Sequence, residues 1–173
     1  SGFGYTIFLN LKQETTKYET KIDMTNEFVL EAITREFPNA VLQSSEPYGF
    51  LTLEIKKEEI KKVIHHLKES SLGFIFLTDI CGIHSPENKE KELGVIYHLH
   101  NLVSNNRIRL KTFFTKENAE VETLTDLYAG ANWMERETFD FYGIKFKGHP
   151  DLRVILNDPD LGYHPMLREY ELE

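Results

Sequence analysis

Cysteine is almost missing from this chain, which contains one, Cys81, among 173 residues. A single thiol cannot build a disulfide framework, and it cannot supply the ligands of a thiolate zinc site or an iron–sulfur cluster. Its place in an apolar segment predicts a small, buried core residue, which is the usual environment of a free cysteine. A chain of this length buries about 70% of its unfolded surface, so its fold requires no disulfide or metal.

An excess of basic residues is also missing, because the formal net charge is −8. Nucleic-acid binding and electrostatic attachment to anionic lipids both use clustered Lys and Arg, so we expect neither a nucleic-acid partner nor direct membrane insertion. The apolar run 72–77 is far shorter than the roughly 20 residues of a membrane-spanning helix. The start of the chain shows neither the basic region nor the cleavage site of a signal peptide, which favours a cytoplasmic location.

The sequence motifs of several enzyme classes are absent as well. No glycine-rich dinucleotide loop follows a predicted strand, and there is neither a phosphate loop nor a serine elbow. His98 and His100 alternate on one face of a predicted strand, but two ligands do not make a metal site. We therefore predict no catalytic residue, no metal and no cofactor in this chain.

Hydrophobic periodicity predicts an α+β domain over residues 24–118. Apolar residues recur at helical spacing in two segments, 26–37 and 57–69. Five segments carry the apolar or alternating pattern of strands, namely a short one from Val41 and those at 51–55, 74–80, 94–100 and 107–114. Polar turns join the last three, which favours antiparallel pairing. We expect a mostly antiparallel sheet with both helices packed on one face, and we place the almost wholly apolar third strand at its centre.

The residues before this domain allow two interpretations. Residues 1–23 are either an extension of the chain or an edge strand, for which the β-rich segment 5–11 is the candidate. The sequence alone does not decide between them.

Residues 119–173 are predicted to form a second region. A capping-box pattern at Thr123 predicts a short helix that ends at Gly130. A longer helix follows, with Asn132 as its N-cap, Glu135 reaching back to it, and Gly143 as a left-handed C-cap. The turn-rich sequence after this helix predicts an extended arm that a partner protein covers.

The densest charged cluster in the chain lies on this predicted helix. Arg136 and Asp140 are four residues apart and can pair on one helix face, whereas Glu135 and Glu137 point in different directions. Spacing alone leaves three interpretations open: a solvated and capped helix, a partner-binding face, or a catalytic carboxylate pair. A hydrolase that uses Glu135, Glu137 and His149 would need these side chains to converge in one pocket.

A long and specific motif begins at the same cluster. It reads ERETFDFYGI at 135–144 and GHPDLR at 148–153. This motif resembles the signature of the C subunit of NADH:quinone oxidoreductase (respiratory complex I), the 30-kilodalton subunit family. Shorter matches occur upstream, at 131–133, 78–79, 97–99 and 107–110. The resemblance runs from about Met24 to Tyr170.

The resemblance implies a non-catalytic structural subunit in the peripheral arm of the complex. A member of this family docks on the D-subunit homologue near the quinone site, with the B-subunit homologue as a further partner, on the cytoplasmic side of the cell membrane. It holds no cofactor, whereas the complex as a whole uses FMN, iron–sulfur clusters, NADH and quinone. The alternative is the equivalent subunit of a membrane-bound hydrogenase or a ferredoxin–plastoquinone complex. The implied partner interface comprises Glu135, Arg136, Glu137, Asp140, Tyr142, His149, Pro150, Asp151, Arg153 and Arg168.

Overall fold

The computed structural model describes residues 24–168, so the predicted extension or edge strand over residues 1–23 lies outside the described part. Its α-helices are α2 (Asn26–Glu36), α3 (Ile60–Glu69) and α4 (Ala131–Tyr142). Its strands are β1 (Val41–Ser45), β2 (Leu51–Ile55), β3 (Phe76–His84), β4 (Leu93–Asn101), β5 (Asn106–Phe114), β6 (Glu120–Glu122) and β7 (Lys145–Lys147). Single 3-10 turns stand at Pro47–Gly49, Lys89–Lys91 and Lys116–Asn118.

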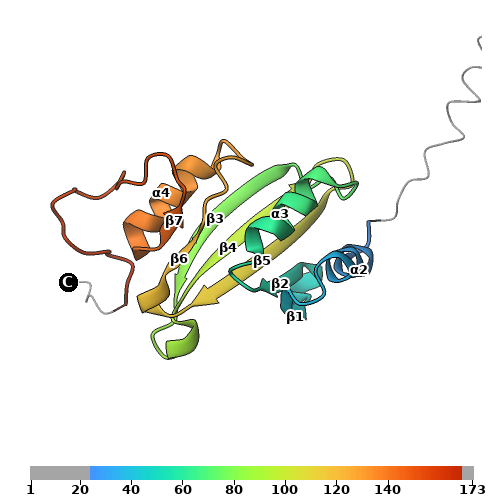
Figure 1. The fold of residues 1–173 in the computed structure, drawn as a ribbon, viewed down its shortest axis with the longest axis horizontal. Helices are drawn as coiled ribbons and strands as arrows, with labels where there is room; N and C mark the ends of the chain where they lie inside the picture. The colour runs from blue at the N-terminus through green and yellow to red at the C-terminus, as the bar shows by residue number, and fades with distance from the viewer. Residues whose placement is uncertain (1–23, 169–173) are drawn as a thin grey trace, which may run out of the picture.

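A five-stranded sheet in the order β1-β2-β5-β4-β3 forms the body of the fold (Figure 1). The pairs β1–β2, β5–β4 and β4–β3 are antiparallel, and only β2–β5 is parallel. The predicted α+β class is thus confirmed, as is the antiparallel meander of its last three strands. The sheet is mixed because α3 carries the chain from β2 back to the far side of the sheet before β3 begins.

The prediction for the third strand was wrong in place and in extent. Strand β3 lies at the edge of the sheet, and it begins two residues later than predicted and continues to His84. The apolar run that suggested a central strand is divided between two environments. Leu72 and Phe74 enter the core ahead of the strand, whereas Ile75 and Phe76 are 57% and 47% exposed.

One face of the sheet supplies the main core. Leu53 and Tyr97 flank Leu110 in register across β2, β5 and β4, and all three are completely buried. Helix α3 packs on this face through an apolar stripe at helical spacing, which consists of Ile60, Val63, Ile64 and Leu67. The opposite face is half exposed at alternate positions of β4 and β5. The packing of α3 on one face, as predicted, therefore buries the main core.

A second, two-stranded sheet joins the start of the C-terminal region to the segment that follows α4. Strand β6 pairs in parallel with β7, with Glu120 opposite Lys145 and Glu122 opposite Lys147. Opposite charges at facing positions stabilise such a pair, and Phe146 is buried beneath it. The region from residue 144 is therefore not all extended arm, and the predicted helix at 123–130 is an irregular turn instead. Thr123 continues the ladder instead of capping a helix, because its N–H donates to Lys147 O at 3.0 Å. The turn that follows is closed by the Leu127 and Tyr128 N–H groups, which donate to Leu124 O at 2.9 and 2.8 Å.

Helix α4 lies against β3, and a glycine permits the close approach (Figure 1). A Cβ atom on Gly82 would stand 2.4 Å from Cδ2 of Tyr142, so the Tyr142 ring rests directly on the strand backbone. The Thr138 hydroxyl, which is buried, donates to Ile80 O at 3.5 Å. The glycine thus sets the distance between α4 and the sheet.

We expect Gly82→Ala to lower the free energy of unfolding by about 1–3 kcal/mol, because the added methyl must displace the Tyr142 ring. Urea unfolding measures the change. Gly130→Ala is the matched control, because no atom lies within 4 Å of a Cβ there and the backbone φ is −65°. A Gly82→Ala cost that stays the same in a Tyr142→Ala background would contradict the proposed contact.

Candidate partner-binding site

Glu135, the fifth residue of α4, is used in a way that its spacing did not suggest. The helix begins at Ala131 with Gly130 as its cap residue, so the predicted N-cap at Asn132 was wrong. Glu135 is completely buried, and it accepts hydrogen bonds from the Thr123 hydroxyl at 2.5 Å and the Leu124 N–H at 2.6 Å. Burial raises the pKa of Glu135 to about 7, although these two hydrogen bonds act in the opposite direction. Glu135 therefore fastens the turn after β6 to the helix.

Asp140 holds the C-terminal arm, which comprises residues 148–168, at positions 155–157. Its Oδ2 atom accepts three consecutive backbone N–H groups, from Ile155, Leu156 and Asn157, at 3.0, 2.8 and 3.1 Å. The Asn157 side-chain amide donates to Oδ1 at 2.9 Å. Burial acts to raise the pKa of Asp140, but these hydrogen bonds outweigh it and leave the pKa lowered. The arm is therefore folded around a buried carboxylate.

Arg136 also serves the arm. Its guanidinium donates to the carbonyls of Arg153 and Val154, at 3.1 and 3.4 Å, and lies 5.1 Å from the centre of the Trp133 ring. The Arg136 side chain is nearly buried, whereas Trp133 is 63% exposed. No ion pair between Arg136 and Asp140 occurs in the described structure, although their spacing permits one. Helix α4 thus presents Trp133 to the surface while Arg136 and Asp140 hold the arm.

The remaining predicted interface residues follow the helix. His149 is half buried, with Nε2 3.1 Å from Asn132 O and Nδ1 accepting the Asp151 N–H at 3.0 Å. Pro150, Asp151 and Arg153 are exposed. Arg153 Nε donates to Asp151 Oδ2 at 2.9 Å, an exposed pair that contributes little to stability. These three side chains are accessible to a partner.

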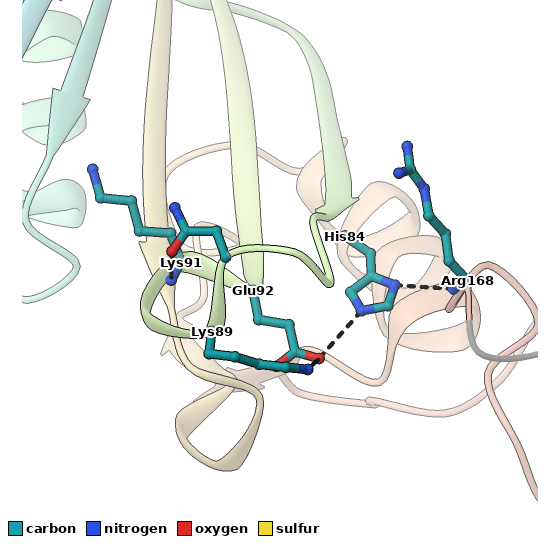
Figure 2. A network of polar contacts seen from close by, with 6 residues as sticks. His84, Lys89, Lys91, Glu92 and Arg168 are labelled. Carbon is teal, nitrogen blue, oxygen red and sulfur yellow. Dashed lines mark hydrogen bonds and ion pairs between the residues drawn. The ribbon is translucent and has the colours of Figure 1, made fainter.

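The end of the arm is held at the tip of β3 (Figure 2). The Arg168 N–H donates to His84 Nδ1 at 3.0 Å, so the ring proton resides on Nε2, which lies 3.4 Å from Glu92 Oε1. Lys89 Nζ is 3.2 Å from the same carboxylate oxygen. Burial acts to raise the pKa of Glu92, but the hydrogen bonds of Lys89 and His84 lower it. The Arg168 side chain points away from this network and is exposed.

A groove of about 450 Å³ lies between β3 and α4. Cys81 lines it and is half exposed, so the predicted core position of this residue was wrong. It points away from the core because its neighbours Ile80 and Gly82 occupy the core face of the strand. Burial and the nearby Asp79 raise the pKa of the Cys81 thiol to about 11, which keeps it protonated at neutral pH.

Large apolar side chains are exposed throughout this region. Those on α4 and the arm are Trp133, Leu156, Tyr163 and Met166. Exposed aromatic and apolar groups clustered on one region are typical of a protein–protein interface.

The family model of the respiratory-chain NADH dehydrogenase 30 Kd subunit matches residues 53–173, which include the whole of this region. The chain belongs to this 30 Kd subunit family. The C subunit of NADH-quinone oxidoreductase from Sinorhizobium medicae is 39% identical over 83% of the chain and 71% of its own length. The chain spans 61% to 71% of four such relatives. The sequence resemblance is thereby confirmed.

Two solved structures resemble this 30 Kd family member in three dimensions. The trypsin-resistant fragment (1-134) of Nqo5 is 31% identical, with a TM-score of 0.63 over 73% of the chain and 98% of the fragment. A chain of the archaeal membrane-bound sulfane sulfur reductase is 25% identical, with a TM-score of 0.71 over 84% of this chain and 85% of that one.

Both histidines of β4 have hydrogen-bond partners within the chain of this family member. His98 Nε2 accepts from Arg109 Nε at 2.8 Å, and His100 Nε2 lies 3.0 Å from Asn105 Oδ1. Between residues 24 and 168, no three His, Cys, Asp or Glu side chains are grouped so that they could hold a metal ion. Glu135 and His149 are engaged with different backbone segments, and Glu137 faces the groove. The three residues of the alternative hydrolase site do not converge.

The anchor at His84 and Glu92 has no signal in the amino-acid sequence. These two residues lie on either side of a turn. The third residue of the anchor, Arg168, is 84 positions from His84. No local spacing signals a contact over that separation.

Proposed function

We propose that the chain is a structural subunit in the peripheral arm of a complex I-type NADH:quinone oxidoreductase. It docks on the D-subunit homologue near the quinone site and also contacts the B-subunit homologue. Family membership supports this assignment, as do the names of the relatives as subunits of that oxidoreductase. No helix in the described part of the chain is long and apolar enough to cross a membrane. We infer that the chain reaches the cytoplasmic side of the cell membrane through its partners.

The main observation in support of the docking proposal is the exposure of Trp133. Its neighbour Arg136 is used inside the chain to hold the arm, whereas the indole remains 63% exposed above that guanidinium. Tryptophan is among the residues that most often contribute a large share of the binding energy in protein–protein interfaces. On the arm, the exposed Arg153, Leu156 and Met166 would add charged and apolar contacts of an interface.

We further propose that this protein performs no redox chemistry of its own. The Cys81 thiol is held in its protonated form, and the histidines on the exposed sheet face are hydrogen-bonded to Arg109 and Asn105. FMN, the iron–sulfur clusters, NADH and quinone would all be bound by other subunits. The contribution of this chain is then to position its neighbours.

We expect Trp133→Ser to weaken binding to the purified D-subunit homologue by about 2 kcal/mol, or roughly 30-fold in Kd. Biolayer interferometry with the tagged homologue measures this change. Tyr48→Ser is the matched control, because Tyr48 is a fully exposed aromatic residue outside α4 and the arm. Equal binding of both variants would contradict the docking surface. Failure of the wild-type chain to bind the homologue would contradict the proposed function itself.

A second candidate is the equivalent subunit of a related membrane complex. The similarity to the archaeal sulfane sulfur reductase over most of both chains supports it. Affinity purification from native membranes with mass spectrometry separates the candidates. Recovery of NADH- and flavin-binding subunits supports the first, whereas a hydrogenase-type large subunit without them supports the second.

A further inference from the structure

The groove between β3 and α4 is lined by residues that take no part in holding the arm through their side chains. Its lining is mostly apolar and includes Phe141, Tyr142 and Met166. Met166 is 52% exposed even though its N–H donates to Phe141 O at 3.1 Å, so the backbone is fixed while the side chain stays at the groove mouth. The groove is therefore a preformed apolar depression and not a gap left by a mobile segment.

Two acidic residues stand on opposite walls of the groove. Asp79 comes from β3 and Glu137 from α4, and both are exposed. No Lys or Arg of the described chain pairs with Glu137, although its helix neighbours Glu135, Arg136 and Asp140 all have partners. The nearest ionic contact of Asp79 is with His98 Nδ1, at 3.9 Å. Asp79 and Glu137 thus place negative charge on both walls of an apolar depression, and the cations that act on its lining are Arg109, on Cys81, and Arg168, on Tyr142.

We propose that this groove receives a segment of a partner protein in which a lysine or arginine stands next to a bulky apolar residue. The apolar side chain enters between Tyr142 and Met166, and the cation lies between Asp79 and Glu137. This inference rests on the proposed function, because it supplies the chemistry of one docking contact. Charge complementarity of this kind fixes the register of a docked segment.

A second copy of the same chain is a poor occupant of this groove. The chain carries a formal net charge of −8, so a copy brought to an acidic rim meets like charge. A metal ion is no better supported, because the described residues hold no group of three ligands and Cys81 beside the rim keeps its proton. A basic and apolar polypeptide segment matches both the lining and the rim.

Charge reversal in the co-expressed complex tests the proposal. We expect Glu137→Lys to reduce the amount of this chain that co-purifies with the tagged D-subunit homologue by about tenfold or more. Glu90→Lys is the matched control, because it makes the same charge change at an exposed site away from the groove, and it should stay within about twofold. Equal recovery of both variants would overturn the inference and leave the wild-type co-purification, and thus the proposed function, intact.

Cys81 provides a second measurement that does not depend on a variant. We expect its alkylation by N-ethylmaleimide at high pH to be at least about tenfold slower in the assembled complex than in the free chain, because the occupant covers the thiol. A photo-crosslinking residue at position 166 then identifies the segment by mass spectrometry. A crosslinked peptide with a lysine or arginine beside a bulky apolar residue supports the proposal. Undiminished alkylation, or a crosslinked peptide without such a pair, overturns it.

Discussion

The Asp140→Asn variant should lose the fixed conformation of its C-terminal arm. In the native chain one carboxylate oxygen accepts three consecutive backbone N–H groups, from residues 155–157. An amide cannot reproduce this arrangement, because it has lost the negative charge and one of its two acceptor atoms is now a donor. Hydrogen bonds to a charged group contribute about 1.5–3 kcal/mol each, so we expect the free energy of unfolding to fall by about 3 kcal/mol.

Limited trypsin digestion reports the release of the arm most directly. Cleavage after Arg153 should become faster in Asp140→Asn, since this residue is exposed and its carbonyl is held by Arg136 only while the arm is folded. Asp160→Asn is the matched control, because it removes the same charge from an exposed carboxylate further along the arm, whereas Asp151 is paired with Arg153 itself. An arm equally resistant to trypsin in both variants would show that Asp140 is dispensable for its conformation.

Acid should weaken the same anchor in the wild-type chain. The pKa of Asp140 is lowered in the folded state, so its contribution to stability is fully present above the unfolded value of about 3.9. As the pH falls from there through the folded pKa, that contribution is lost. Trypsin does not work at such pH, so hydrogen exchange of residues 155–157 is the suitable measurement. Protection that persists in acid would contradict the assignment.

Glu135→Gln is expected to act in the opposite direction and to stabilise the protein at alkaline pH. The folded pKa of about 7 exceeds the unfolded value of about 4.3, so the folded state binds more protons between these values. Stability of the wild-type chain therefore falls as pH rises through this window, by roughly 3–4 kcal/mol in total. A glutamine keeps the acceptor for the Leu124 N–H and does not ionise, so the variant avoids this loss.

Urea unfolding at pH 5 and pH 8 measures the difference between the two proteins. The stability of Glu135→Gln relative to wild type should increase by about 2–3 kcal/mol between these pH values. Glu137→Gln is the control, since that carboxylate is two residues away and exposed, and its relative stability should not change with pH. A glutamine variant that is equally destabilised at both values would mean that the ionised form of Glu135 is the one the fold requires.

The sequence predicted best those helices and strands in which apolar and polar residues alternate at the period of the element. Helix α3 and strands β4 and β5 lie within a few residues of their predicted bounds, because each exposes and buries residues at its own period. The Gly143 cap was also predicted, and its φ of 73° is the left-handed conformation that glycine adopts readily. Strands β6 and β7 have three residues each and pair across about 25 positions, too short for a period to be visible.

The candidate site was predictable in its composition and not in its contacts. The sequence directed attention to Glu135, Arg136 and Asp140, and the structure gives each of them a partner in the same chain. Charged residues on a helix look alike in sequence whether they bind a loop or another protein, because the loop residues that they hold lie 11 to 18 positions away. Whether any of them also contacts a neighbouring protein of the complex stays a prediction.

The arm is fixed at several points along its length, and this has a consequence for the kinetics of association. His164 Nδ1 lies 2.9 Å from Asp140 O, Leu167 is buried, and the Arg168 N–H is bound by His84. A segment that is ordered before the encounter loses less conformational entropy on docking than one that folds onto its partner. The bound state then needs fewer intermolecular contacts to reach a given affinity, and the arm does not have to fold during the encounter.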